Sequence, residues 1–269
     1  MSHLDHPAAV SIQGLTKVFE RGGTHALDDI TLELEAGELV SLIGPSGCGK
    51  STLLRVIADL VPPTSGSVRI GGKTAHQARL DHDYGMVFQE AVLYDWRTVA
   101  KNVALPLEML GWSRSRRTER VQEMLDLVEL TGFEKHHPWQ LSGGMQMRVA
   151  IARALSFDPS LLLMDEPFGA LDEMTRERLN LELLRIWERS SPTIVFVTHS
   201  ISEAVFLSTR VVVMSPRPGR VAGIVDIDLP SARTPDTREE PRFFELVTEV
   251  RELLRGHMDA HGSVAEEQG

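Results

Sequence analysis

The sequence is poor in cysteine and has no long apolar run. Cys48 is the only cysteine in 269 residues, so no disulfide can form within the chain, as is typical of a reducing compartment. No stretch approaches the roughly 20 apolar residues that cross a bilayer. Residues 1–8 lack the basic-then-apolar order of a secretory signal. These absences lead us to expect a protein that stays in the cytoplasm.

Basic residues are also in deficit. The chain carries 28 Lys and Arg against 38 Asp and Glu, a formal charge of −10. Because binding to a phosphate backbone relies on clustered Lys and Arg, this balance argues against a nucleic-acid partner. The hydrophobic share of 42% suffices for one sizeable core, so the motifs must decide how the chain is organised.

Two kinds of strand pattern are present. Short alternating runs near the N-terminus predict antiparallel strands with one wet face; they are Val10–Ile12, Ala26–Glu35 and Glu38–Ile43. Continuous apolar runs predict strands of a largely parallel sheet, buried on both faces; they are Leu161–Met164, Thr193–Val197 and Val211–Met214. Between the first two, Met174–Arg189 has apolar residues at helical spacing. This order indicates βαβ units and an α/β fold.

The middle and the end of the chain lack strand-like runs. Between Pro106 and Pro138, apolar residues recur at helical spacing, which predicts a helical insertion. Its basic stretch, Arg114–Arg120, is interpreted as a solvated face. Prolines from Pro230 onward predict a linker. One appended amphipathic helix with a frayed end should follow, with apolar positions at Phe244, Val247, Val250 and Leu254.

The strongest motif lies near the N-terminus. The run Gly44-Pro45-Ser46-Gly47-Cys48-Gly49-Lys50-Ser51 satisfies the phosphate-loop pattern, and it lies between the apolar strand Leu39–Ile43 and the helical run Thr52–Leu60. Its glycines let backbone N–H groups converge on phosphate oxygens at a helix N-terminus. We expect Lys50 to contact the β and γ phosphates, and Ser51 to coordinate Mg²⁺. The nucleotide contacts should extend through Thr52.

A second motif ends a buried strand in two carboxylates. Asp165 and Glu166 follow Leu161–Met164 directly, and buried carboxylates are costly without a cation or hydrogen-bond partners. We expect Asp165 to hold Mg²⁺ and Glu166 to polarise the attacking water as general base. A plain acidic loop after a strand is the alternative.

A third motif, Leu141-Ser142-Gly143-Gly144-Met145-Gln146, precedes the helical run Val149–Leu155, and Ser142 lies 92 residues after Lys50. Together with the phosphate loop and the acidic pair, this run resembles the signature sequence of ABC ATPases. The family's other marks occur at their expected places: Gln89 after Val87-Phe88, Gly169-Ala170-Leu171-Asp172 after the acidic pair, and His199 after Thr193–Val197. The resemblance runs from Val10 to about Val225.

That resemblance implies a P-loop NTPase core with an antiparallel β-subdomain and an inserted α-helical signature subdomain. It also implies two nucleotide-binding domains that meet head to tail, so that ATP on Lys50 of one copy is closed by Ser142, Gly143 and Gly144 of the other. By the same resemblance His199 contacts the γ-phosphate, and Gln89 senses Mg²⁺ and water. Asp172 shapes the dimer interface.

Three positions keep an alternative or depart from the family. Phe19 occupies the place where the family has an aromatic residue against adenine; a core residue of an edge strand is the alternative. Cys48, near a helix N-terminus, is treated as a small spacer, with redox control a remote hypothesis. Met147 stands where relatives usually have a second Gln, beyond the phosphate-facing residues.

Each motif occurs once, whereas a tandem-domain translation factor would need two copies of each. The 92 residues between Lys50 and Ser142 leave no room for the long coiled coil of a DNA-repair ATPase. A free-standing ATPase of this length most resembles bacterial importers. Three of its runs, residues 93–99, 164–176 and 215–220, resemble the nitrate, sulfonate and taurine type. An exporter subunit or a non-transport ABC ATPase is the alternative. The implied partners are a second copy, permease subunits and a periplasmic solute-binding protein. The implied location of the protein is the cytoplasmic face of the inner membrane.

The expected organisation is an ATPase domain over 9–228, with the helical subdomain at about 90–160, and an extension over 229–269. The segment Glu90–Val99 is expected to receive a short cytoplasmic helix of the permease; a plain solvent loop is the alternative. ATPase subunits of this family do not contact the transported solute, so the sequence does not identify that solute. Related systems also carry pyrimidine precursors.

Overall fold

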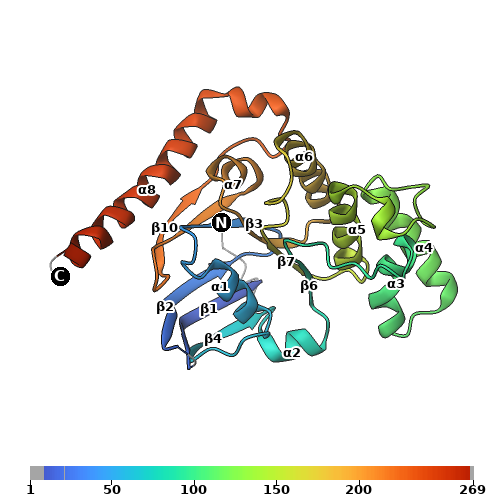
Figure 1. Cartoon of the computed structure of the whole chain (residues 1–269), viewed down its shortest axis with the longest axis horizontal. Coiled ribbons are helices and arrows are strands. Elements are labelled where there is room, and N and C mark those ends of the chain that lie inside the picture. Colours follow the sequence, from blue (N-terminus) through green and yellow to red (C-terminus); the bar gives the residue numbers. More distant parts are fainter. Residues whose placement is uncertain (1–8, 21, 267–269) are drawn as a thin grey trace, which may run out of the picture. The chain divides into compact units, whose positions relative to one another are not determined.

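The computed structural model describes residues 9–20 and 22–266 (Figure 1). Two compact units divide the chain: one combines residues 1–83 with 193–269, and the other spans residues 84–192. None of the helices within the described ranges has the length and hydropathy of a membrane span. The expectation that residues 1–8 carry no secretory signal lies outside the described residues, and so do the last three residues, 267–269, of the expected frayed end.

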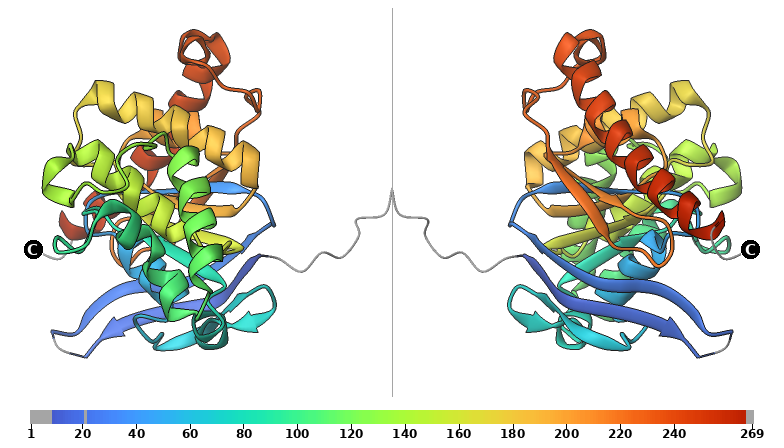
Figure 2. Two further views of the ribbon diagram at one scale, coloured as in Figure 1. Left: turned by 90° about the vertical axis from the view of Figure 1, so that its right-hand side faces the viewer. Right: turned by 90° about the vertical axis from the view of Figure 1, so that its left-hand side faces the viewer.

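The first unit contains an antiparallel sheet of four strands in the order β2-β1-β4-β5. Its strands are β1 (Val10–Phe19), β2 (Thr24–Leu34), β4 (Ser65–Ile70) and β5 (Lys73–Thr74). Strands β1 and β2 are paired from Val10↔Leu34 to Phe19↔Thr24, and they run side by side as the two long strands near the base of Figure 2. Burial alternates along most of both strands, as their period-two sequence requires. The prediction of antiparallel strands at Val10–Ile12 and Ala26–Glu35 is confirmed.

The same unit contains the strands β3 (Leu39–Ile43), β8 (Thr193–Val197), β9 (Arg210–Met214) and β10 (Val221–Asp226). Their order is β10-β9-β3-β8, with β3 parallel to both neighbours and β10 antiparallel to β9. All five residues of β3 are buried. The prediction of an antiparallel strand with one wet face at Glu38–Ile43 is therefore wrong. Ser41 looked like a wet position, but it is fully buried and accepts a hydrogen bond from the Ser208 hydroxyl at 2.5 Å.

The helices of this unit are α1 (Lys50–Ile57), α2 (Ala75–Leu80), α7 (Ile201–Leu207) and α8 (Pro241–Glu266), with the short η2 (Pro235–Glu239) before α8. Helix α8 packs on α7, β9 and β10, and Figure 2 shows it running beside these strands. Its buried side is formed by Phe243, Leu246, Val247 and Val250. Phe244 is 57% exposed, so the predicted apolar face was wrong at that position.

The second unit joins two parallel strands, β6 (Tyr84–Val87) and β7 (Leu161–Asp165), to a group of helices. The helices are α3 (Val99–Met109), α4 (Arg114–Leu127), α5 (Gly143–Leu155) and α6 (Glu173–Ser190), with the short η1 (Pro138–Gln140) before α5. Helices α3, α4 and α5 contact one another, and α5 also contacts β6. The predicted helical insertion is confirmed, although α3 begins before Pro106 and includes it.

The basic run at the start of α4 is only partly a solvated face. The Arg120 side chain is 17% exposed, and its guanidinium donates to the carbonyl oxygens of Ser156 and Leu155 at 2.8 and 3.2 Å. These carbonyls lie at the C-terminal end of α5, where a cation is favourable. Arg120 therefore fixes α4 to the helix that follows the signature motif.

Candidate functional site

The phosphate loop connects β3 to α1 in a conformation that only glycine fits at several points. Gly47 and Gly49 have φ of +76° and +111°. A Cβ on Gly49 would lie 2.8 Å from the Ala26 carbonyl oxygen, and one on Gly44 would lie 2.8 Å from Cys48 Sγ. Side chains at these positions would clash or strain the loop. The glycine spacing of the motif is thus required by the loop itself, and α1 begins at Lys50 directly after it.

Lys50 and Cys48 are buried inside this loop. The Lys50 ammonium, 6% exposed, donates to the carbonyl oxygens of Gly44 at 2.7 Å and Pro45 at 3.1 Å. Burial raises the pKa of the Cys48 thiol, although Lys50 opposes this change. The helix N-terminus therefore does not make Cys48 an activated thiolate, which favours the spacer interpretation.

His199 is exposed and follows β8 on a backbone that is fixed on both sides. The buried Thr198 hydroxyl donates to Glu203 Oε2 at 2.5 Å and accepts from the Ser200 amide at 3.0 Å. Ser200 caps α7 by accepting from the Glu203 amide. Sequence reasoning missed Glu203, although the spacing Ser200-x-x-Glu203 is a capping-box signal that identifies it.

Phe19 is the last residue of β1, and its side chain is half-buried. Strand β1 lies between β2 and β4, so the alternative of a core residue in an edge strand is wrong about the strand's position. The Lys17 ammonium lies 5.0 Å from the centroid of the Phe19 ring. An accessible ring at a strand end is a suitable stacking surface for a planar base.

In the second unit, Asp165 ends the fully buried strand β7 and is itself 7% exposed. Glu166 follows with φ of +47°, a left-handed conformation that is uncommon for a residue with a Cβ. A Cβ on Gly169 would lie 3.5 Å from Glu166 Oε2 and 3.6 Å from Gln89 Nε2. The carboxylate and the amide therefore approach the same point, and Gly169 leaves room for both.

Ser142 and Asp172 begin the two helices of the signature region. Ser142 Oγ accepts from the Met145 amide at 3.3 Å at the start of α5, and an Asp172 oxygen accepts from the Thr175 amide at 3.0 Å at the start of α6. This backbone donor lowers the pKa of the exposed Asp172 carboxyl. Both side chains are good helix caps for the same reason: a short oxygen reaches an otherwise unpaired N–H.

The signature glycines differ in how closely they are packed. A Cβ on Gly144 would lie 2.9 Å from the Thr175 methyl, whereas one on Gly143 would meet only Leu171, at 3.6 Å. Gly144 thus lets α5 and the start of α6 approach each other. Met147 is 3% exposed, so the residue that departs from the family pattern is an apolar side chain at a buried position.

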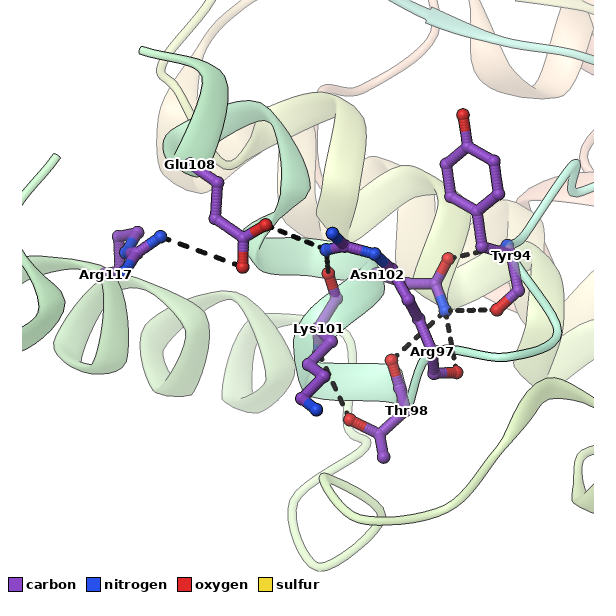
Figure 3. A network of polar contacts seen from close by, with 7 residues as sticks. All are labelled: Tyr94, Arg97, Thr98, Lys101, Asn102, Glu108 and Arg117. Atoms are coloured by element: carbon purple, nitrogen blue, oxygen red, sulfur yellow. Dashed lines mark hydrogen bonds and ion pairs between the residues drawn. The ribbon is translucent and has the colours of Figure 1, made fainter. Parts of the chain in front are cut away.

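The segment after Gln89 forms a structured loop. Asn102, fully buried in α3, accepts from the Tyr94 amide at 2.8 Å and donates to the carbonyl oxygens of Tyr94, Arg97 and Thr98 at 3.1 Å each (Figure 3). Figure 3 also shows Arg97 bonded to Glu108, at 2.9 Å. These bonds fix the backbone and leave the Trp96 side chain 74% exposed.

The predicted site residues are divided between the two units. Phe19, the phosphate loop 44–52 and His199 belong to the first; Gln89, Asp165 with Glu166, the signature 142–144 and Asp172 belong to the second. In the first unit the Lys50 ammonium contacts its own phosphate loop. In the second unit the side chains of Glu166 and Gln89 both approach Gly169.

A family model described as "ABC transporter" matches residues 27–169, more than half of the chain. The chain belongs to the ABC transporter family. It is 44% identical to the nitrate import ATP-binding protein NrtD of Synechocystis sp., over 92% of this chain and 95% of that protein. It is 45% identical to the taurine import ATP-binding protein TauB of Rhizobium johnstonii, over 87% and 91% of the two chains.

A solved structure has the same fold. It is a dimeric ATP-binding cassette in a post-hydrolysis state with ADP and Pi, 36% identical, with a TM-score of 0.71 over 81% of this chain and 98% of that one. The predicted α/β fold with a P-loop NTPase core is confirmed. As a member of this family the chain is an ATPase, and ATP is its substrate.

Proposed function

We propose that this ABC ATPase powers solute import as the cytoplasmic subunit of a bacterial inner-membrane transporter of the nitrate, sulfonate and taurine type. The single observation that supports this is the identity of 44–45% with nitrate and taurine import subunits over 87–92% of the chain. The partners are a second copy, permease subunits and a periplasmic solute-binding protein. The ATPase domain takes in residues 9–228, with an extension over 229–269.

Nucleotide binding begins at the phosphate loop. The loop amides and the N-terminus of α1 attract the triphosphate, and Lys50 exchanges its bonds to Gly44 and Pro45 for phosphate oxygens. Phe19 offers its ring to adenine. Binding thereby draws a buried ammonium from neutral carbonyls to a full negative charge, which strengthens its hydrogen bonds.

The residues expected to hold Mg²⁺ fit that ion. Ser51, Gln89 and Asp165 supply a hydroxyl, an amide oxygen and a carboxylate, and hard oxygen donors of this kind, few in number beside nucleotide phosphates and water, suit magnesium. The burial of Asp165 at 7% exposure is consistent with a carboxylate that meets a cation. When bound, the ion neutralises charge that develops on the phosphates.

Hydrolysis is assigned to Glu166, Gln89 and His199. Glu166 takes a proton from the attacking water as general base, and the Gln89 amide, which faces the same point as the Glu166 carboxylate, holds that water in place. His199, on its fixed backbone between Thr198 and Ser200, donates to the γ-phosphate.

Closing the nucleotide site requires a second copy of the chain. The Ser142 hydroxyl uses its oxygen to cap α5 but keeps its proton, which is available to donate to the γ-phosphate of the partner's nucleotide. The N-terminal amides of α5, beside Gly143 and Gly144, add a positive field. Asp172, at the start of α6, lies at the same dimer face. Release of phosphate removes these contacts, so the dimer opens.

The permease docks on the loop 90–99. Its exposed aromatic side chains, Tyr94 and Trp96, have ring centroids 4.8 Å apart and are 40% and 74% exposed, and such pairs are typical anchors for a partner helix. Trp96→Ala and Asp95→Lys should each weaken co-purification with the permease and leave nucleotide affinity unchanged. Met109→Ala, which truncates another exposed apolar side chain, is the matched control. Normal assembly of both loop variants would argue for a plain solvent loop.

The import assignment is tested in proteoliposomes. The chain is reconstituted with the permease and binding protein encoded beside it, and uptake of labelled nitrate, taurine and a short alkanesulfonate is followed with ATP enclosed on the side of the ATPase. We expect ATP-dependent uptake of one of the three. Efflux driven by ATP, or ATP turnover that none of the three stimulates, would contradict the proposal.

A further inference from the structure

Lys17 is a buried lysine that has no carboxylate partner among the residues that the structure describes. It lies on β1, is 9% exposed, and forms no ion pair within the described ranges 9–20 and 22–266. Its ammonium donates to the Pro62 carbonyl oxygen at 2.7 Å and lies 5.0 Å from the Phe19 ring centroid. Lysine is rarely buried without a paired charge, so this placement calls for an explanation.

Lys17 and Phe19 meet at the end of β1. Residues two apart in a strand project from the same face. The register of β1 against β2 shifts between Lys17 and Val18, and the 5.0 Å between the Lys17 ammonium and the Phe19 ring centroid shows that the two side chains still meet. The Phe19 ring is half-buried and lines a surface hollow of about 900 Å³ together with Lys17 and Pro63. The ring is therefore not enclosed by core packing, and the ammonium is a contact that restricts its orientation.

The link between β1 and the loop 61–64 does not depend on Lys17. The Val18 amide donates to Thr64 Oγ1 at 2.9 Å, and the Thr64 amide donates to the Thr16 carbonyl oxygen at 2.8 Å. These bonds already hold the loop against the strand. The ammonium of Lys17 is thus an addition to an existing attachment, and its distinctive contact is the one with the aromatic ring.

We propose that Lys17 is a positioning residue for base recognition: its ammonium holds one face of the Phe19 ring and leaves the other face to adenine. Attraction between a cation and an aromatic face fixes the plane of the ring, and a pre-oriented ring loses less conformational freedom when a base stacks on it. The inference rests on the proposed role of Phe19 as the adenine platform. It adds a residue that acts through Phe19 and does not touch the nucleotide.

The test separates base binding from phosphate binding. Affinities of the full-length chain for ATP and for inorganic tripolyphosphate are measured by calorimetry in EDTA, so that no turnover occurs. Lys17→Met keeps the aliphatic stem and removes the charge. We expect this variant to weaken ATP binding about 3–10-fold, the range of a partly buried cation–π contact, and to leave the affinity for tripolyphosphate unchanged. Lys17→Arg should retain most of the ATP affinity.

Thr64→Val is the matched control, because it removes both hydrogen bonds of the Thr64 hydroxyl to Val18, between the same loop and strand, and leaves the Lys17 ammonium in place. It should not alter the ratio of the two affinities. If Thr64→Val lowers ATP affinity as Lys17→Met does, Lys17 acts only as a loop anchor and the inference is overturned. Equal loss of ATP and tripolyphosphate affinity in Lys17→Met would overturn it too.

A double-mutant cycle with Phe19→Ala decides whether Lys17 acts through the ring. Lys17→Met should have no further effect on ATP affinity once Phe19 is alanine. If the two losses add, the positioning role is wrong while the adenine platform stands. If Phe19→Ala itself binds ATP normally, the proposed adenine platform fails, and the inference about Lys17 fails with it.

Discussion

At the scale of single residues, Glu166 combines two features that suit a general base. Its backbone is in the left-handed region, with φ of +47°, directly after the buried end of β7. Its Oε2 also faces the point that Gln89 Nε2 approaches, next to Gly169. A strained conformation of this kind persists where the surrounding structure holds it, often at functional sites.

Glu166→Gln should therefore keep the shape of the site and lose the proton acceptor. We expect ATP affinity to stay within about threefold and turnover to fall at least about 100-fold, the usual contribution of a general base. Steady-state phosphate release and equilibrium ATP binding measure the two effects. Glu188→Gln, which changes an exposed carboxylate of α6, is the control. Rapid turnover by Glu166→Gln would remove Glu166 from its role.

Gly144 and Gly143 offer a second comparison at this scale. Alanine at Gly144 would approach the Thr175 methyl to 2.9 Å, but alanine at Gly143 would make ordinary contact at 3.6 Å. Overpacking costs about 1–3 kcal/mol, so Gly144→Ala should melt about 2–4 °C or more below the native chain. Gly143→Ala should melt at or above it, since alanine favours a helix. Equal melting temperatures would show that α5 and α6 are not closely packed there.

At the scale of elements, short motifs were more predictable than strand faces. The helix after the phosphate loop, the buried strands β7 to β9 and the helix α6 follow from apolar runs and periodicity. The face of β3 did not follow, because Ser41 satisfies its hydroxyl inside the core through Ser208. The burial of Phe243 in place of Phe244 depends on how α8 meets α7 and β10, and a sequence pattern with both phenylalanines does not contain that information.

The loop 90–99 is an element whose shape depends on one buried amide. Asn102→Ala would remove the four hydrogen bonds that connect α3 to the loop backbone. We expect a loss of stability of about 1–3 kcal/mol, since backbone groups lose their partners, and permease binding weakened at least about tenfold. Denaturant unfolding and co-purification measure these effects. Gln122→Ala, which removes one exposed bond on α4, should change neither; native-like docking by Asn102→Ala would contradict the role of a preformed loop.

At the scale of the whole molecule, the candidate site is distributed over both compact units and, in the proposal, over two copies of the chain. The sequence contains every motif, but a single chain does not show which residues a second copy contributes to the site. Only the resemblance to the family predicts that Ser142 and Gly144 face the nucleotide of the other copy. Geometry adds a reason at Ser142. This neutral cap begins α5, which has no acidic residue in its first turn, and such a helix N-terminus favours an anionic partner group.

The most direct test of this account is the mass of the Glu166→Gln chain in sedimentation velocity, with and without Mg²⁺ and ATP. We expect a monomer without nucleotide and a dimer with it, because in the proposed arrangement ATP joins the phosphate loop of one copy to the signature helix of the other. Ser142→Arg in the same background should bind ATP yet remain monomeric. A chain that stays monomeric with saturating ATP, or a Ser142→Arg variant that dimerises normally, would contradict the shared nucleotide site.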